Sequence, residues 1–144
     1  MNHKKIIIAS GYFDPMHIGH IEYLKLAKSL GGKLVVILNN DKQAVLKKGK
    51  AFMPQEERKI ILGALKFVDE IFLSIDGDKS VCKSIKEIAE KYRGKEIIFS
   101  KGGDRFTHEI PEAKICRELK IEIIDGLGKK IQSSSNLTGI KEIK

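Results

Sequence analysis

The chain has 144 residues, 42% hydrophobic and 32% charged, which is typical of a single globular domain and excludes an intrinsically disordered chain. Its apolar runs are far too short to cross a membrane, and no secretory signal is present, so we expect a cytoplasmic protein without a membrane partner. The formal net charge of +8 points to an anionic partner. The lysines are scattered and no aromatic-rich basic stripe is present, which favours a nucleotide or phosphate over a nucleic acid.

Short β-rich runs alternate with amphipathic stretches along the whole chain. Strands are predicted at Lys5–Ala9, Lys33–Leu38, Glu70–Ser74, Glu96–Ser100 and Ile121–Ile124. Helices are predicted at Ile18–Leu30, Gln55–Leu65, Lys79–Tyr92 and Ile110–Leu119, with a last one beginning near Ser134. This alternation predicts an α/β fold in one domain over residues 1–144, with a parallel sheet covered by helices on both faces.

The most informative segment follows the first predicted strand and reads Gly-Tyr-Phe-Asp-Pro-Met-His-Ile-Gly-His, from Gly11 to His20. A glycine turn followed by helical periodicity from Ile18 predicts a strand, a tight loop and a helix. Backbone N–H groups and two imidazoles then meet at a helix N-terminus, where phosphate binds well. His17 and His20 share one face of the first helical turn, and Gly19 leaves room for a ligand near the backbone. The structural alternative is a histidine pair that only caps the helix.

The pattern G-x-F-D-x-x-H-x-G-H resembles the first motif of the cytidylyltransferase-like nucleotidyltransferases. That family includes glycerol-3-phosphate cytidylyltransferases, heptose-phosphate adenylyltransferases, archaeal FAD synthetases and mononucleotide adenylyltransferases. Residues 17–20 also spell the His-Ile-Gly-His of class I aminoacyl-tRNA synthetases, which share the fold. The resemblance implies a Rossmann-like, doubly wound five-stranded parallel sheet, with ligands bound at the carboxyl ends of the strands near the topological switch point.

The resemblance also implies a reaction. A nucleoside monophosphate passes from CTP or ATP to a sugar or polyol phosphate and pyrophosphate is released, with Mg²⁺ bridging the phosphates. The implied partners are a nucleoside triphosphate and a phosphorylated small molecule. FMN adenylyl transfer and a catalytically silent nucleotide-binding regulatory domain are the alternatives. The choice between ATP and CTP, the acceptor and homodimer formation all stay open.

By the same resemblance, His17 and His20 donate hydrogen bonds to the triphosphate. The backbone of Tyr12 and Phe13, flanked by Gly11 and Gly19, cradles the phosphates.

Lys47 and Arg58 are expected to hold the incoming phosphate of the acceptor. Lys47, with Lys48 as the near alternative, is expected in a lysine loop after an Asn-Asn-Asp turn, where a merely solvated cluster is the structural alternative. Arg58 occupies the family's E-x-R position, and its alternative is an ion pair with Glu57 or Asp69.

Two further segments resemble family motifs. Ser133, Ser134 and Ser135 either cap a helix or form a second phosphate clamp, and Lys129 or Lys130 stands near the place where relatives carry an arginine. Asp104 lies in a Lys-Gly-Gly-Asp segment that resembles the heptose-phosphate adenylyltransferases and binds the nucleotide in this interpretation, with a plain turn as the alternative.

Three acidic residues and two cysteines complete the set of candidates. Asp14 either holds Mg²⁺ or caps the following helix, and the sequence leaves both open. Asp76 and Asp78 are interpreted as parts of a turn. Cys82 and Cys116 form no C-x-x-C pair, so neither a zinc site nor a redox motif is indicated.

Overall fold

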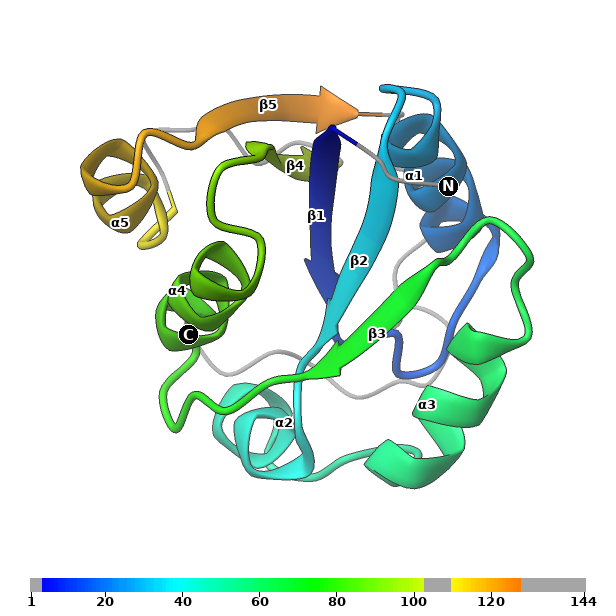
Figure 1. Ribbon diagram of the computed structural model, residues 1–144. Coiled ribbons are helices and arrows are strands. Elements are labelled where there is room, and N and C mark those ends of the chain that lie inside the picture. The colour runs from blue at the N-terminus through cyan, green and yellow to red at the C-terminus, as the bar shows by residue number, and fades with distance from the viewer. Residues whose placement is uncertain (1–3, 103–109, 128–144) are drawn as a thin grey trace.

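The computed structural model describes residues 4–102 and 110–127. Five strands form one parallel sheet in the order β3-β2-β1-β4-β5 (Figure 1). They are β1 (Lys5–Gly11), β2 (Lys33–Leu38), β3 (Glu70–Leu73), β4 (Glu96–Gly102) and β5 (Glu122–Leu127). The helices are α1 (Ile18–Lys28), α2 (Asp41–Lys48), α3 (Gln55–Gly63), α4 (Cys82–Lys91) and α5 (Ala113–Glu118). The predicted α/β fold with a five-stranded parallel sheet is confirmed.

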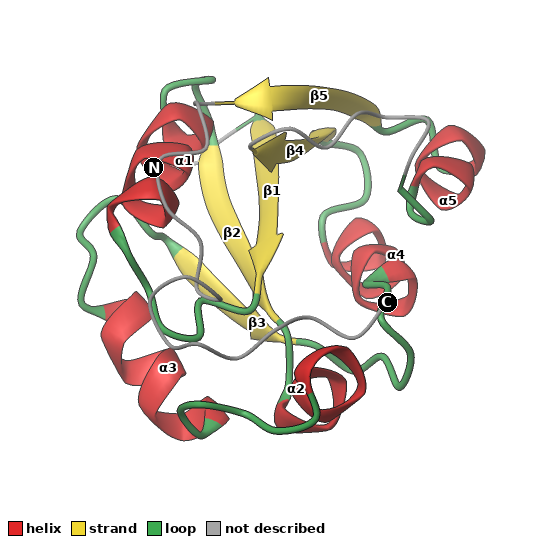
Figure 2. Ribbon diagram, turned by 180° about the vertical axis from the view of Figure 1, so that it is seen from behind, coloured by secondary structure: helices red, strands yellow, loops and turns green. Residues whose placement is uncertain are grey.

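Two hydrophobic cores lie on opposite faces of the sheet. Successive side chains of a strand point to opposite faces, so the continuous apolar runs of the inner strands supply both cores. Ile6 and Ile8 pack with α4 and α5, whereas Ile7 and Ala9 pack with α1 and α3. Figure 2 shows the two helix pairs on either side of the sheet.

The strand order reverses between β1 and β4. From β1 the chain moves outward to β2 and β3, and it then returns to the other side of β1 for β4 and β5. In a doubly wound sheet this reversal marks the place, at the carboxyl ends of the strands, where ligands bind. The segment from Gly11 to His20 starts at the last residue of β1 and therefore begins at this edge.

Helix α2 was not predicted, and the structure corrects the expected lysine loop. Lys47 and Lys48 lie in the last turn of α2, and Gly49, with φ 86°, caps the end of the helix. At its start, Asn40 Oδ1 accepts the N–H of Gln43 at 2.8 Å, and Gln43 Oε1 accepts the N–H of Asn40 at 3.1 Å. This reciprocal pair is a capping box, which fixes the first turn of a helix that contains few apolar residues.

Other boundaries differ by a few residues. Strands β1 and β4 continue past their predicted ends, and α1, α3, α4 and α5 are shorter than predicted. Helix α4 begins at Cys82 rather than Lys79, because the Asp76 carboxylate accepts the N–H groups of Lys83 at 2.7 Å and Ser84 at 3.0 Å. The predicted helix near Ser134 lies outside the described residues. No helix in the described part of the chain is long and apolar enough to span a membrane.

Candidate active site

The loop after β1 is shaped by a close contact between Gly11 and Phe13. Phe13 has φ 51°, and its buried ring lies against Gly11. A Cβ atom on Gly11 would lie 2.9 Å from Cζ of Phe13, closer than real Cβ atoms come. The same ring meets His20 edge-on, with the two ring centroids 5.1 Å apart. Gly11 is therefore needed for Phe13 to support the imidazole of His20.

His17 and His20 together cap the N-terminus of α1. Nδ1 of His17 accepts the backbone N–H of Gly19, and Nδ1 of His20 accepts that of His17, both at 3.1 Å. The rings stack with centroids 3.8 Å apart. A nitrogen that accepts a hydrogen bond from an N–H group carries no proton, so in each neutral imidazole the proton lies on Nε2. Each ring thus caps the helix with one nitrogen and keeps a donor on the other.

Both imidazoles are held neutral. Burial lowers the pKa of His17. Burial also lowers the pKa of His20 to about 3, with further contributions from the charges of Lys47 and Lys48 and from His17 once it is protonated. The two lysines therefore create a positive potential at the same helix end. The arrangement combines neutral N–H donors, an N-terminal helix dipole and lysine charge, a combination that suits a polyphosphate.

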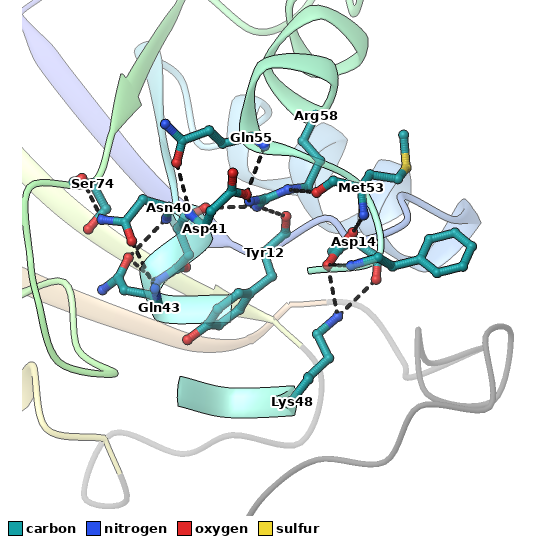
Figure 3. Close-up of polar contacts among 12 residues, drawn as sticks. Tyr12, Asp14, Asn40, Asp41, Gln43, Lys48, Met53, Gln55, Arg58 and Ser74 are labelled. Carbon is teal, nitrogen blue, oxygen red and sulfur yellow. Dashed lines mark hydrogen bonds and ion pairs between the residues drawn. The ribbon is translucent and has the colours of Figure 1, made fainter. Parts of the chain in front are cut away.

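The two lysines have different surroundings. Nζ of Lys48 is buried and lies 2.9 Å from the carbonyl oxygen and 3.4 Å from Oδ2 of Asp14 (Figure 3). Lys47 is half-buried, and its Nζ lies 4.4 Å from the centroid of the Tyr12 ring. Of the two, Lys47 is the more exposed, and it lies beside the loop after β1.

Asp14 does not cap α1, and in this structure its carboxylate is bound by protein groups. It is fully buried, its Oδ2 accepts the N–H of Phe52 at 2.8 Å, and its Oδ1 accepts that of Met53 at 2.6 Å. The cap of α1 is His17 instead. With Lys48 on Oδ2 as well, the carboxylate joins the loop after β1 to the segment between α2 and α3.

Arg58 is likewise buried and bound to protein groups. Its side chain is 0% exposed, and it donates from Nη1 to the carbonyl oxygens of Tyr12 at 2.8 Å and Asn39 at 2.7 Å. Nε donates to the carbonyl of Met53 at 3.0 Å, and Nη2 pairs with Oδ1 of Asp41 at 2.7 Å (Figure 3). These partners are all protein groups, so in this structure the guanidinium joins the loops after β1 and β2 rather than facing an incoming phosphate.

The alternative ion pair of Arg58 with Glu57 or Asp69 is not found either, because its acidic partner is Asp41. Asp69 instead pairs with Lys28 at 2.6 Å.

The sequence did not predict a group of hydrogen-bonded polar side chains on α2 and around it. Gln43 is fully buried, accepts from Nδ2 of Asn39 at 3.0 Å and donates to the carbonyl oxygen of Ser80 at 2.8 Å. Asp41 and Gln55 exchange two side-chain to backbone hydrogen bonds, both at 2.8 Å, which join α2 to α3. The spacing Asn-x-x-Gln of the capping box was the readable signal for this region.

The remaining expected residues cannot be placed. Asp104, Lys129, Lys130, Ser133, Ser134 and Ser135 lie outside the described residues. Asp76 and Asp78 lie in the loop between β3 and α4. Asp76 accepts the N–H groups of Lys83 and Ser84 at the start of α4, and Asp78 accepts that of Ser80. Within residues 4–102 and 110–127, no three His, Cys, Asp or Glu side chains come together as a metal site.

Comparison with known proteins decides the family. The profile of the cytidylyltransferase-like family matches residues 8–136, which include the histidine pair and both lysines. The chain belongs to the cytidylyltransferase-like family. As a member it is a nucleotidyltransferase, as the sequence predicted, and its Rossmann-like fold is the one expected.

Relatives and solved structures agree with this assignment. This cytidylyltransferase-like chain is 31% identical to the FAD synthase of Pyrococcus abyssi over 85% of its own length and 80% of that protein. It is 35% identical to the bifunctional protein HldE of Campylobacter fetus over 85% of its length, but it spans only 26% of HldE. The lipopolysaccharide core biosynthesis protein of Thermoplasma volcanium superposes with a TM-score of 0.68 and 26% identity, over 88% of this chain and 98% of that one.

A more distant structure of the same fold contains a metal ion. The bifunctional NMN adenylyltransferase/ADP-ribose pyrophosphatase of Francisella tularensis, in complex with AMP and a manganese ion, matches with a TM-score of 0.62 and 12% identity. The match covers 92% of this chain and 39% of that one.

Proposed function

We propose that this cytidylyltransferase-like protein transfers AMP from ATP to a phosphomonoester and releases pyrophosphate. The observation that carries the proposal is the stacked pair His17 and His20, whose Nε2 donors lie at a helix N-terminus beside Lys47. ATP is favoured over CTP because a relative over most of the chain is an FAD synthase, and FAD is FMN joined to AMP. The Lys-Gly-Gly-Asp segment at 101–104 also resembles ATP-using members.

In the proposed reaction an oxygen of the acceptor phosphate attacks the α-phosphorus of ATP. A new oxygen–phosphorus bond forms as the bond from the α-phosphorus to the bridging oxygen breaks, and that oxygen leaves with pyrophosphate. A phosphomonoester is mostly dianionic at neutral pH, so no side chain has to remove a proton. Catalysis then consists of positioning and of stabilising the charge that builds on the phosphate oxygens.

Each residue around the loop has a proposed part in this step. His17 and His20 donate from Nε2 to phosphate oxygens of ATP, and the backbone from Gly11 to Phe13, with Gly19, cradles the chain of phosphates. Because both rings are neutral, the site's positive charge comes from lysine. Lys47 is proposed to attract the acceptor phosphate.

Three buried residues are proposed to position these groups. Arg58 holds the backbone just after β1 and β2, while Asp14 and Lys48 join the loop after β1 to the segment before α3. Their partners are all protein groups, so their effect on the reaction passes through the loops that they hold.

Mg²⁺ is proposed to arrive with ATP. The side chain named for it, Asp14, does not fit a metal site because its carboxylate oxygens accept from Lys48, Phe52 and Met53. Mg²⁺ commonly keeps several water ligands and binds through substrate phosphates, so the Mg–ATP complex is the proposed substrate.

Two acceptor classes have support. A sugar or polyol phosphate is the acceptor predicted from the sequence, and the match to 98% of a lipopolysaccharide core biosynthesis protein supports it. FMN is the second candidate, because the match covers 80% of an FAD synthase. A single domain over residues 1–144, a cytoplasmic location and a homodimer stay predictions.

Pyrophosphate release in the presence of Mg²⁺ tests the proposal. ATP and CTP are run separately against heptose 1-phosphate, glycerol 3-phosphate and FMN. We expect release with ATP and one of these acceptors. Release with CTP alone would contradict the nucleotide assignment. ATP binding without release for any acceptor would instead favour the regulatory-domain alternative.

A further inference from the structure

The seam between β1 and β4, meaning the row of paired residues that joins the two strands, ends before either strand does. The two strands pair from Lys5↔Glu96 to Ile8↔Phe99 and pair no further. On its other side β1 stays paired with β2 as far as Gly11↔Leu38, and β4 stays paired with β5 as far as Gly102↔Leu127. The opening therefore lies at the point where the strand order reverses.

Tyr23 of α1 is inserted into this opening. Its hydroxyl donates to the carbonyl oxygen of Ser100 at 2.6 Å and accepts the N–H of Ser10 at 3.2 Å. If the pairing of β1 with β4 continued for one more residue, the N–H of Ser10 would donate directly to the carbonyl oxygen of Ser100. The phenol oxygen thus replaces a ladder hydrogen bond and holds the two strands apart.

Neighbouring contacts keep the phenol in place. The hydroxyl of Ser100 donates to the carbonyl oxygen of Ile8, the last paired residue of β1, at 2.9 Å. Tyr23 and Ser100 are both buried, and burial raises the pKa of Tyr23 to about 12, so the phenol stays protonated as a donor.

Helix α1 carries Tyr23 as well as the histidine pair. His20 and Tyr23 are three residues apart on α1, on one side of the helix, since residues at this spacing share a face. The hydroxyl therefore fixes the distance of α1 from both strands, and with it the position of the helix N-terminus.

We propose that Tyr23 is a positioning residue that shapes the nucleotide site by holding the carboxyl ends of β1 and β4 apart and by setting the place of His17 and His20. The inference rests on the proposed function. Without the hydroxyl, the strands can pair further and α1 can shift. The donors would then move relative to the nucleotide, and a displacement of about 1 Å can cost about a hundredfold in rate.

Tyr23→Phe removes the hydroxyl and keeps the ring. The matched control is Tyr92→Phe, because the hydroxyl of Tyr92 also has two partners, Lys33 at 2.8 Å and Glu70, at the amino ends of β2 and β3. The dissociation constant of ATP and the KM values of ATP and acceptor are measured well below the unfolding temperature of each variant.

We expect Tyr23→Phe to raise the dissociation constant and KM of ATP by about tenfold or more. The acceptor KM should change less than the ATP constants, because Lys47 lies on α2 whereas His17 and His20 lie at the start of α1, the helix that carries Tyr23. Tyr92→Phe should lower the unfolding temperature and leave all three constants unchanged. Wild-type affinity for ATP in folded Tyr23→Phe overturns the inference while the proposed function stands, whereas a wild-type protein that binds no ATP overturns both.

Ser100→Ala tests the same seam if Tyr23→Phe does not fold. It removes the hydrogen bond to the carbonyl oxygen of Ile8 and leaves Tyr23 intact. Weaker ATP binding with a smaller change in the acceptor KM supports the inference, and unchanged ATP binding overturns it.

Discussion

Nδ1 of His20 accepts the backbone N–H of His17 at 3.1 Å, and the two rings stack with centroids 3.8 Å apart. Capping a helix and binding a phosphate are therefore not competing roles for this pair. The nitrogen used for the cap determines that the other nitrogen carries the proton. Helix capping thus prepares both rings as donors.

The histidine pair makes stability depend on pH. The pKa of His20 falls from 6.5 when unfolded to about 3 when folded, and that of His17 is also lowered. Between these pH values the unfolded chain binds more protons than the folded chain. The free energy of unfolding therefore falls as the pH is lowered below about 6.5. For one group the fall is at most about 1.4 kcal/mol per pH unit.

Denaturant unfolding between neutral pH and pH 4 measures this slope. In His20→Gln the glutamine can accept the N–H of His17 as in a capping box, but it does not titrate. The variant should show a shallower slope over this range. An identical slope in wild type and variant would show that His20 is not held neutral by the fold.

Arg58→Ala should destabilise the protein by about 3–5 kcal/mol, because it leaves buried carbonyl oxygens and Asp41 without their donor. Urea unfolding followed by circular dichroism measures the loss. Arg93→Ala is the control: Arg93 is exposed, and its pairing with Glu90 should contribute less than about 1 kcal/mol. A stable Arg58→Ala with only a raised acceptor KM would restore the direct phosphate role.

Gly11→Ala should lower both stability and activity. The added methyl group would meet the Phe13 ring, which also supports His20, and overpacking of this kind costs about 1–3 kcal/mol. Gly77→Ala is the matched control, since a Cβ at Gly77 meets nothing within 4 Å. Equal thermal unfolding temperatures for the two variants would show that the Gly11–Phe13 contact is not tight.

Asp14→Asn should lower stability and leave the dependence of activity on Mg²⁺ concentration unchanged. The amide keeps the shape of the carboxylate but loses its charge beside buried Lys48. Titrating Mg²⁺ at saturating ATP compares the two proteins. A requirement for much more Mg²⁺ in the variant would mean that Asp14 binds the ion after all.

The strands could be predicted from the sequence because their apolar runs are buried on both faces. Lys33–Leu38 matches β2 to the residue. Helix α2 could not be found by periodicity, because its eight residues are mostly polar and follow two asparagines that are typical of a turn. Only the capping box of Asn40 and Gln43 distinguished it from a loop.

The site divides in the same way between local and distant contacts. The pairing of His17 with His20 spans three residues, so helical spacing alone predicts it. Arg58 meets Tyr12 across 46 residues, and Asp14 meets Phe52 across 38. Such contacts depend on how the loops pack at the end of the sheet, so a buried arginine and a ligand-binding arginine look alike in one sequence.

The central claim is that Nε2 of His17 donates to the triphosphate, and His17→Asn tests it most directly. Asparagine is a good N-cap residue, so α1 is preserved while the ring donor is lost. The measurement is kcat/KM for pyrophosphate release from ATP, with exposed Glu22→Gln on the same helix as the control. We predict a loss of about 10²–10³ for His17→Asn and none for the control. A folded His17→Asn with wild-type kcat/KM would contradict the account.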